Sequence, residues 1–373
     1  MRRASSKLEN SIDNLFEGYS NPCFMAFPSM NRFFLFLLAF TLPCVLGARS
    51  LPEQLAFYGR WDRRQPERVI TVNSGSSIKA RFEGTGMIAL FDTAVNQLPF
   101  PTIAWRIDGG SWQEAEIAPS VTLAEKLSPG PHDLFLMARG LDEHQSRWAS
   151  PLIASITLTD LTPTAGRFIP LLVETGPKLE FLGDSITEGV LVHDEMLKET
   201  PWPWLTDGRL SYAGLTAMEL HAQWRQVGFG GQGVTRGGSG GIPAASDTLN
   251  FFYKDCPRDD WQPDAVIINQ GTNDRGVKPD FFKPIYAAYL KQIRTAYPKA
   301  KIIAIIPFCG AQSESIKAVI QERHQDQDTQ SYVIDASQWL RHEDYTDGLH
   351  PNVRGGEKAA KQLAAELRVI LAK

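Results

Sequence analysis

The sequence lacks several features that would point to a particular class of protein. The net charge is only -4 over 373 residues, so no basic surplus indicates binding to nucleic acid or to an anionic membrane. The four cysteines, Cys23, Cys44, Cys256 and Cys309, have neither CxxC nor zinc-finger spacing, which argues against a zinc cluster or a disulfide framework. Whether Cys256 and Cys309 pair in an oxidising compartment stays open. The composition is that of an ordinary globular chain, and its length predicts two domains.

The sequence also has no apolar run that would span a bilayer comfortably. The most apolar segment, residues 33–48, is short for a transmembrane helix and is interrupted by Pro43. It ends in small residues, which predicts a signal peptide at about 30–48 within a targeting region at 1–48. Met30 offers a conventional start, so either synthesis begins there or the leader is unusually long. We expect a secreted or periplasmic protein with no stable membrane insertion after cleavage.

Residues 51–160 have the period-two pattern of half-buried strands. In "SIKARFEG", apolar Ile78, Ala80 and Phe82 alternate with charged residues, and "TIAWRIDGG" and "SVTLAEKL" continue this pattern. Turn signals such as "DGGS" and "SPGP" separate the runs, and no stretch has a convincing helical period. Repeated short strands with turns between them predict an antiparallel β-sandwich, of jelly-roll-like type.

From residue 178 onward, strand-like runs alternate with amphipathic, helix-like runs. Continuous apolar strands between such helices predict a parallel sheet that is covered on both faces. Residues 161–177, with proline and glycine, are expected to link this second domain, at 178–373, to the first. The predicted strands are "KLEFLG", "RQVGF", "PDAVIINQ", "KIIAIIPF" and "SYVIDA", and the predicted helices span 211–224, 279–298, 313–328 and 352–372.

Polar residues and glycines follow these strands where each strand ends. In open α/β sheets, ligands bind beyond the carboxyl ends of the strands, so these residues are expected to converge on one rim. Asp184 is open to either a structural or a tuning role. The segments are Asp184-Ser185 after the first strand, "GFGGQG" at 228–233, "GTNDRG" at 271–276 and "DGLHP" at 347–351.

This set of residues fits acyl transfer. The Ser185 hydroxyl is a weak nucleophile until a base takes its proton, and His350 can be that base. Asp347, three residues earlier, can fix the ring tautomer and stabilise the imidazolium. The oxyanion of the tetrahedral intermediate needs preorganised donors, for which the backbone N–H of Ser185, the N–H of Gly231 and the amide of Asn273 are candidates. Gly231 has no Cβ between its N–H and a substrate.

Other interpretations of the same residues are weaker. Ser185 could only cap a helix. Residues 228–233 fit the dinucleotide fingerprint G-x-G-x-x-G, but "VTRGGSGG" rather than a helix comes next. His342, Asp344 and His350 could form a metal site, yet their spacing matches no familiar one. We therefore expect neither a metal nor a cofactor.

Four short blocks of the second domain resemble the SGNH, or GDSL-type, esterase and lipase superfamily. The resemblance covers the chain from Lys178 to the C-terminus and implies a flavodoxin-like three-layer α/β/α fold. The blocks are "GDS" at 183–185, "GGQG" at 230–233, "GTND" at 271–274 and "DGLH" at 347–350.

The resemblance also implies a role for each matched residue. Ser185 would be the nucleophile, and Asp347 and His350 the other members of the triad. Gly231 and Asn273 would join the backbone of Ser185 as oxyanion donors. These roles agree with those that the chemistry of the side chains predicts.

The β-rich domain before the hydrolase domain and the run "GFGGQGVTR" are similar to family 2 carbohydrate esterases, which deacetylate plant polysaccharides such as xylan. Those esterases often orient the histidine through a backbone carbonyl, so Asp347 departs from their pattern and leaves room for another substrate. In "TPWPWLTDG" at 200–208, prolines predict a loop that carries Trp202 and Trp204. These tryptophans either plug the loop onto the domain or stack on a sugar face.

The predicted protein is a secreted serine esterase that removes O-acetyl or similar small acyl groups from a carbohydrate by a Ser-His-Asp mechanism. Its partner would be an acylated carbohydrate or another small ester. One alternative is an esterase or lipase that uses the same triad on lipid or aryl esters. A second alternative, from another class, is a non-catalytic carbohydrate-binding protein.

Overall fold

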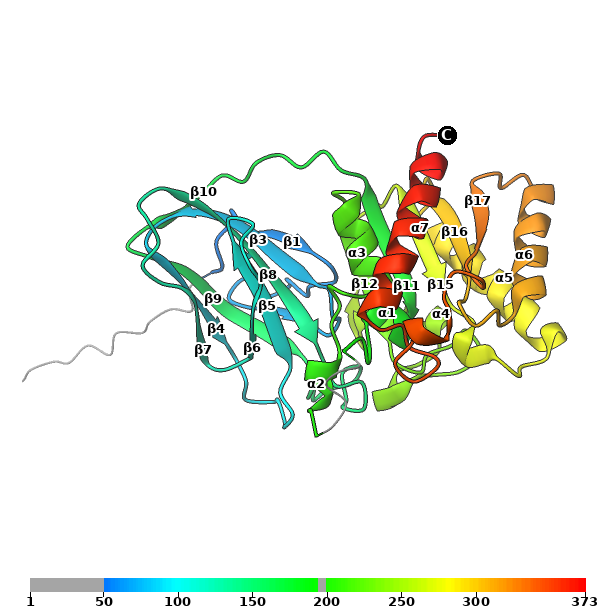
Figure 1. The fold of residues 1–373 in the computed structure, drawn as a ribbon, viewed down its shortest axis with the longest axis horizontal. Coiled ribbons are helices and arrows are strands. Elements are labelled where there is room, and N and C mark those ends of the chain that lie inside the picture. The colour runs from blue at the N-terminus through cyan, green and yellow to red at the C-terminus, as the bar shows by residue number, and fades with distance from the viewer. Residues whose placement is uncertain (1–49, 194–198) are drawn as a thin grey trace, which may run out of the picture. The chain divides into compact units, whose positions relative to one another are not determined.

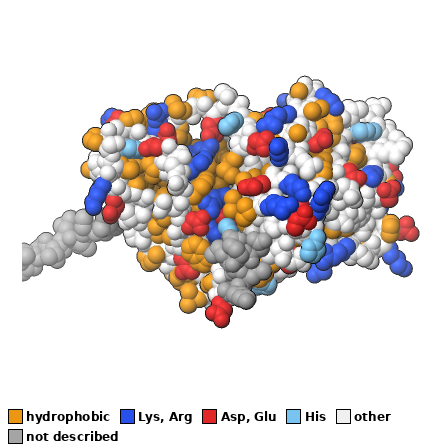
Figure 2. Space-filling view, viewed as in Figure 1, with side chains coloured by type: hydrophobic (Ala, Val, Ile, Leu, Met, Phe, Trp, Pro, Cys, Tyr) orange, Lys and Arg blue, Asp and Glu red, His pale blue; other side chains and the backbone are white. Residues whose placement is uncertain are grey.

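The computed structural model describes residues 50–193 and 199–373. The predicted targeting region at 1–48, with Met30, lies outside the described residues. Within the described ranges, no helix has both the length and the hydropathy needed to cross a membrane. On the face that Figure 2 shows, acidic and basic side chains are interspersed, in keeping with the small net charge.

The first half of the described chain consists of antiparallel strands (Figure 1). One sheet has the order β1-β3-β8-β5-β6, with β10 also paired to β3, and a second sheet has the order β2-β9-β4-β7. The strands are β1 (Ala56–Tyr58), β2 (Val69–Thr71), β3 (Ser77–Glu83), β4 (Gly86–Phe91), β5 (Thr102–Ile107), β6 (Gln113–Glu116), β7 (Ser120–Ala124), β8 (Pro131–Gly140), β9 (Ile156–Thr164) and β10 (Arg167–Ile169).

One apolar core serves both antiparallel sheets. Ile78, Ala80 and Phe82 of β3 are fully buried in it, as the period-two pattern predicts. The long central strand β8 has no such polar face, because Phe135 and Met137 point the other way, into a core cluster of the second half. β8 therefore joins the two halves. Strands β9 and β10 extend the antiparallel half into residues 161–177, the segment expected to be a linker.

The second half contains a five-stranded parallel sheet with the order β12-β11-β15-β16-β17, the order of flavodoxin-like sheets. The first two strands, β11 and β12, lie side by side, and the chain then crosses to the other side of β11. The strands are β11 (Lys178–Asp184), β12 (Gln223–Phe229), β15 (Ala265–Asn269), β16 (Lys301–Ile306) and β17 (Ser331–Asp335).

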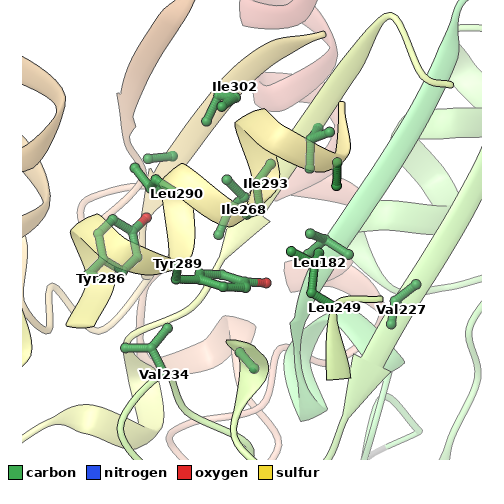
Figure 3. Close-up of a cluster of buried hydrophobic side chains, with 14 of the residues drawn as sticks. Leu182, Val227, Val234, Leu249, Ile268, Tyr286, Tyr289, Leu290, Ile293 and Ile302 are labelled. Carbon is green, nitrogen blue, oxygen red and sulfur yellow. The ribbon is translucent and has the colours of Figure 1, made fainter. Parts of the chain in front are cut away.

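Apolar side chains of the parallel sheet alternate between two core clusters. One cluster joins the sheet to α5 and α6 (Figure 3), and the other joins it to α3 and α7. The helix predicted at 211–224 ends earlier, at Glu219, and the last two residues of that prediction begin strand β12 instead. The helices are α1 (Ser185–Glu188), α2 (Trp202–Leu205), α3 (Tyr212–Glu219), α4 (Ala245–Thr248), α5 (Pro279–Ala296), α6 (Ser313–Gln325) and α7 (Val353–Leu371), and the remaining short elements are η2 (Ser239–Gly241), β13 (Phe251–Tyr253), β14 (Cys256–Pro257), η3 (Thr272–Asp274) and η4 (His342–Asp344).

Candidate active site

Ser185 is the first residue of α1, directly after the end of β11. The cap of this helix is Asp184, whose carboxylate accepts the N–H of Ile186. The capping role is thus filled by the neighbour, and the Ser185 hydroxyl is left for other contacts. A Cβ on Gly183 would lie 2.0 Å from Oγ1 of Thr187, so glycine is needed for this tight strand-to-helix turn.

Ser185, His350 and Asp347 form a continuous chain of hydrogen bonds. Ser185 Oγ lies 2.8 Å from Nε2 of His350, and Nδ1 of the same ring lies 2.8 Å from Oδ2 of Asp347. With Nδ1–H donating to the carboxylate, Nε2 is free to accept the serine proton. The other carboxylate oxygen of Asp347 accepts the backbone N–H of His350. The structure therefore brings together the three side chains on which general-base activation of a serine depends.

The charges around His350 favour its protonated form. Burial alone would lower the pKa of His350, but the hydrogen bond and the charge of Asp347 outweigh it, and the net result is a raised pKa. Burial opposes ionisation of Asp347, yet hydrogen bonds from His350 keep the pKa of that carboxyl well below its usual range. Burial raises the pKa of Asp184 to about 7. The charge of Asp184 is also among the causes of the raised pKa of His350, which favours a tuning role in addition to its capping contact.

Gly231 lies on the loop after β12, in a left-handed conformation with φ of 69° that favours glycine. In the described part of the chain, its N–H meets no hydrogen-bond acceptor, unlike the N–H of neighbouring Gly230, which donates to Glu188 at 3.0 Å. Asp274 holds the far end of this loop by accepting the N–H groups of Val234 and Thr235. A fixed loop with a free N–H is what an oxyanion donor requires.

Asn273 contacts Asp184, the neighbour of Ser185, but its amide is already engaged. Nδ2 donates to the backbone carbonyl of Gln232 at 2.9 Å and to Oδ2 of Asp184 at 3.2 Å. The longer bond to Asp184 is the one that an oxyanion could replace. Asn273 therefore also braces the loop that carries Gly231.

The segment with Trp202 and Trp204 is a one-turn helix, α2, and the loop prediction was wrong here. Pro203 stands in the first turn, where its missing N–H costs no intrahelical hydrogen bond. The Trp202 ring packs edge-on against His144, with centroids 4.6 Å apart. Trp204 donates from its indole N–H to Glu116 and lies against Arg139, so its side chain contacts the antiparallel half.

Sequence reasoning missed an ion pair that connects the antiparallel half to the helix of the nucleophile. Arg147 follows β8 and makes two bonds, of 2.5 and 2.6 Å, to the carboxylate of Glu188 at the end of α1. Both side chains are fully buried. The two residues stand 41 positions apart, and no motif links them, so the sequence carried no signal of this pair. For Asp274 the sequence did give a signal, because this residue completes the block "GTND".

The competing interpretations acquire no support from these contacts. No α-helix opens directly after the glycine run at 228–233, as a dinucleotide site would require. Asp344 pairs with Lys358 and Arg354, and no cluster of three metal-ligating side chains occurs among the residues that the structure describes. Cys256 and Cys309 are both free thiols, which answers the question of their pairing.

Comparisons with known proteins place this site in a family. Residues 181–358 match the model of the GDSL-like Lipase/Acylhydrolase family, and this span contains Ser185, Gly231, Asn273, Asp347 and His350. The predicted superfamily is confirmed: the chain contains a GDSL-like acylhydrolase domain. The matched model is that of lipases and acylhydrolases.

The individual relatives that the chain resembles have more specific names than the family. The chain is 28% identical over 320 residues to the acetylxylan esterase / glucomannan deacetylase of Cellvibrio japonicus, over 81% of this chain and 82% of that protein. It is 23% identical over 337 residues to the cellulase/esterase CelE of Acetivibrio thermocellus, over 84% of this chain but only 39% of that longer protein. A family two carbohydrate esterase from Clostridium thermocellum, solved with cellohexaose, shares the fold with a TM-score of 0.74 at 22% identity, over 85% of this chain and 99% of that one.

Proposed function

We propose that the protein is a serine esterase that removes O-acetyl or similar small acyl groups from a carbohydrate. The observation that carries the proposal is the hydrogen-bond chain from Ser185 Oγ through His350 to Asp347, with both bonds at 2.8 Å. The named activities of the relatives, an acetylxylan esterase / glucomannan deacetylase and a cellulase/esterase, support a carbohydrate ester as substrate.

In the proposed mechanism, Ser185 Oγ attacks the acyl carbonyl carbon while Nε2 of His350 takes the hydroxyl proton. The carbonyl oxygen becomes an oxyanion that the N–H groups of Ser185 and Gly231 hold, with the Asn273 amide as a third donor. His350 then gives its proton to the leaving sugar oxygen, and the C–O bond breaks. Water, deprotonated by His350, attacks the acyl-enzyme. His350 then returns that proton to Ser185 Oγ as the bond to the acyl group breaks and acetate leaves. Asp347 stabilises the imidazolium in both halves of the cycle.

The finer structural assignments belong to the same proposal. We assign the antiparallel half, from residue 51 through the end of β10 at Ile169, to a jelly-roll-like β-sandwich. The rest of the predicted linker, up to residue 177, is the connecting segment, and 178–373 is a flavodoxin-like three-layer hydrolase domain. Secretion after cleavage of a leader at about 30–48 remains part of the proposal. The shared apolar core of the antiparallel sheets and the two clusters on the parallel sheet support the fold assignments.

Two assays test the proposed substrate. Acetate release from a panel of acetylated glycans is expected, together with a steep fall in activity along a series of 4-nitrophenyl esters as the acyl chain lengthens. Activity that rises with chain length and releases no acetate from glycans would favour a lipid or aryl esterase. Binding to glycans without hydrolysis of 4-nitrophenyl acetate would leave only the carbohydrate-binding alternative.

A further inference from the structure

The side chain of Glu143 is largely buried at the edge of the candidate active site, and its carboxylate receives no hydrogen bond from the described residues. Glu143 follows β8 of the antiparallel half and is only 8% exposed. The nearest cationic atom recorded for it, Nε2 of His144, is 4.0 Å away from Oε1, which is beyond hydrogen-bond distance. In residues 50–193 and 199–373, no N–H or O–H group donates to this carboxylate. Neither carboxylate oxygen is among the fully buried atoms that lack a partner, so the carboxylate remains accessible to a ligand that can donate a hydrogen bond.

The carboxylate lies against the glycine loop. A Cβ on Gly230 would stand 1.4 Å from Oε2 of Glu143, so only glycine allows this approach. Farther along the loop, a Cβ on Gly240 would meet the backbone carbonyl of Gln145 at 2.4 Å. Glu143 therefore borders the loop that presents the N–H of Gly231.

His350 is also close enough to interact with Glu143. Burial and the neighbouring charge of Glu188 raise the pKa of Glu143, and the charge of His350 opposes this rise. In return, the charge of Glu143 contributes to the raised pKa of His350. A residue that touches the glycine loop and senses the base lies beside the space where an ester must bind.

Two contacts fix the loop that carries Glu143. Arg147 anchors it to Glu188 through the buried pair, and His144 packs against the ring of Trp202. The position of the carboxylate is thus set by the fold before a substrate arrives, which lowers the entropic cost of binding.

The chemistry of the substrate says which part of it can satisfy Glu143. An ionised carboxylate only accepts hydrogen bonds. An acetyl group has no O–H or N–H to donate, whereas a sugar has hydroxyl groups beside the ester oxygen. We propose that Glu143 binds a sugar hydroxyl next to the scissile ester, so that the antiparallel half supplies a specificity-determining residue to the hydrolase site. This inference rests on the proposed function.

The test compares three esters: a methyl xyloside with one O-acetyl group and free neighbouring hydroxyls, the same sugar fully acetylated, and 4-nitrophenyl acetate. For Glu143→Gln we expect kcat/KM on the monoacetate to fall roughly tenfold, and for Glu143→Ala roughly 100-fold, mainly through KM, because a bond to a charged group is lost. The other two esters offer no hydroxyl, so their rates should stay within about twofold. The exposed Glu125, replaced by Gln, is the matched control and should change nothing.

Each other outcome overturns the inference. An equal loss on all three esters would mean that Glu143 acts through His350 or through folding, which a melting curve of Glu143→Gln distinguishes. Unchanged rates on the monoacetate would remove the subsite but leave the esterase intact. A wild-type protein that cleaves 4-nitrophenyl acetate and neither sugar ester would refute the proposed function, and the subsite with it.

Discussion

Ser185 lies between two loops that are built differently. On one side, the loop with Gly230 and Gly231 is tied by its backbone to Glu188, which is fully buried and pairs with the equally buried Arg147. On the other side, His350 depends on Asp347, three residues away, whose side chain is 39% exposed. The loop with the proposed oxyanion donor is therefore fixed by long-range contacts in the core, whereas the proposed base is fixed by a local turn that water can reach.

The two loops therefore suit two different tasks, the preorganised binding of an oxyanion and the transfer of protons. The donors that hold an oxyanion must be in place before the charge develops, and a buried network provides such rigidity. The base must exchange protons with solvent and product, and a partly exposed turn permits this. Substitutions around the glycine loop should therefore mainly lower the stability of the protein. Substitutions at the turn with Asp347 and His350 should mainly change the pH dependence of the rate.

The largest effect should come from the residue that both loops serve. We expect Ser185→Ala to lower kcat by at least about 10⁴-fold, since loss of the nucleophile in a catalytic serine triad removes most of the rate enhancement. Its melting temperature should match the wild type, because Ser185 caps nothing. Steady-state kinetics on 4-nitrophenyl acetate and a melting curve give both numbers. A variant that keeps more than a tenth of the wild-type rate would show that Ser185 is not the nucleophile.

The next effect should be on stability and concerns the buried side. Arg147→Met leaves the carboxylate of Glu188 buried without its partner, which typically costs about 3–5 kcal/mol of unfolding free energy. Denaturant unfolding measures this change. Because Glu188 also holds Gly230, kcat should fall to a similar extent on sugar and aryl esters. The exposed pair of Arg167 and Glu83 provides the control, and Arg167→Met should alter stability by less than about 1 kcal/mol. Equal effects of the two substitutions would contradict the contrast between the loops.

A smaller effect, on rate and pH dependence, should mark the exposed side. His350 must be neutral to accept the serine proton, and its pKa is raised, so kcat/KM should fall as the pH drops, with a midpoint above the usual ~6.5. Asp347→Asn removes the main cause of the raised pKa and should move this limb to lower pH. It should also lower kcat about 10²-fold, less than the ~10⁴-fold of serine proteases, because water can reach this turn.

Further variants distinguish how much each titrating group near Ser185 contributes to the pH profile. Burial raises the pKa of Asp184 to about 7, so Asp184 can contribute to the acid limb as well, and the profile of Asp184→Asn identifies its share. If Asp347→Asn left the acid limb where it is in the wild type, Asp347 would not be the partner that sets the pKa of His350.

The smallest effects should distinguish the two tryptophans of α2. Trp202 contacts His144, the neighbour of Glu143, and remains our candidate for stacking on a sugar. Trp202→Ala should raise KM for an acetylated oligosaccharide a few-fold without affecting 4-nitrophenyl acetate. Trp204 is bonded to Glu116, so Trp204→Ala should mainly lower the melting temperature. Equal losses on both substrates for Trp202→Ala would make it a packing residue as well.

The sequence predicted those parts of the site that local patterns encode. Strands β11, β12 and β15 each lead directly into a short block with a polar residue or glycines, and the block with His350 follows β17 after a longer segment. The topology of such sheets brings these ends together, so Ser185, Asn273 and His350 could be placed on one rim. The predicted elements fit for the same reason, since apolar periodicity reports burial directly.

The remaining features depend on contacts between distant segments. Glu143, Arg147 and Glu188 lie in no motif, and only the packing of β8 against the second half brings them together. The helix at Trp202 was missed because two prolines in a short segment usually indicate a loop, although the first turn of a helix tolerates proline. Sequence reasoning therefore named the proposed reacting groups and missed Glu143, Arg147 and Glu188, which lie around them.

The most direct measurement of the central claim is covalent trapping of the nucleophile. A fluorophosphonate reacts with a serine only when a neighbouring base activates it, and peptide mass spectrometry locates the adduct. The account predicts one adduct per wild-type chain, on Ser185, and an almost complete loss of labelling in His350→Ala. An adduct on another residue, or undiminished labelling of Ser185 without His350, would contradict the proposal that His350 activates Ser185.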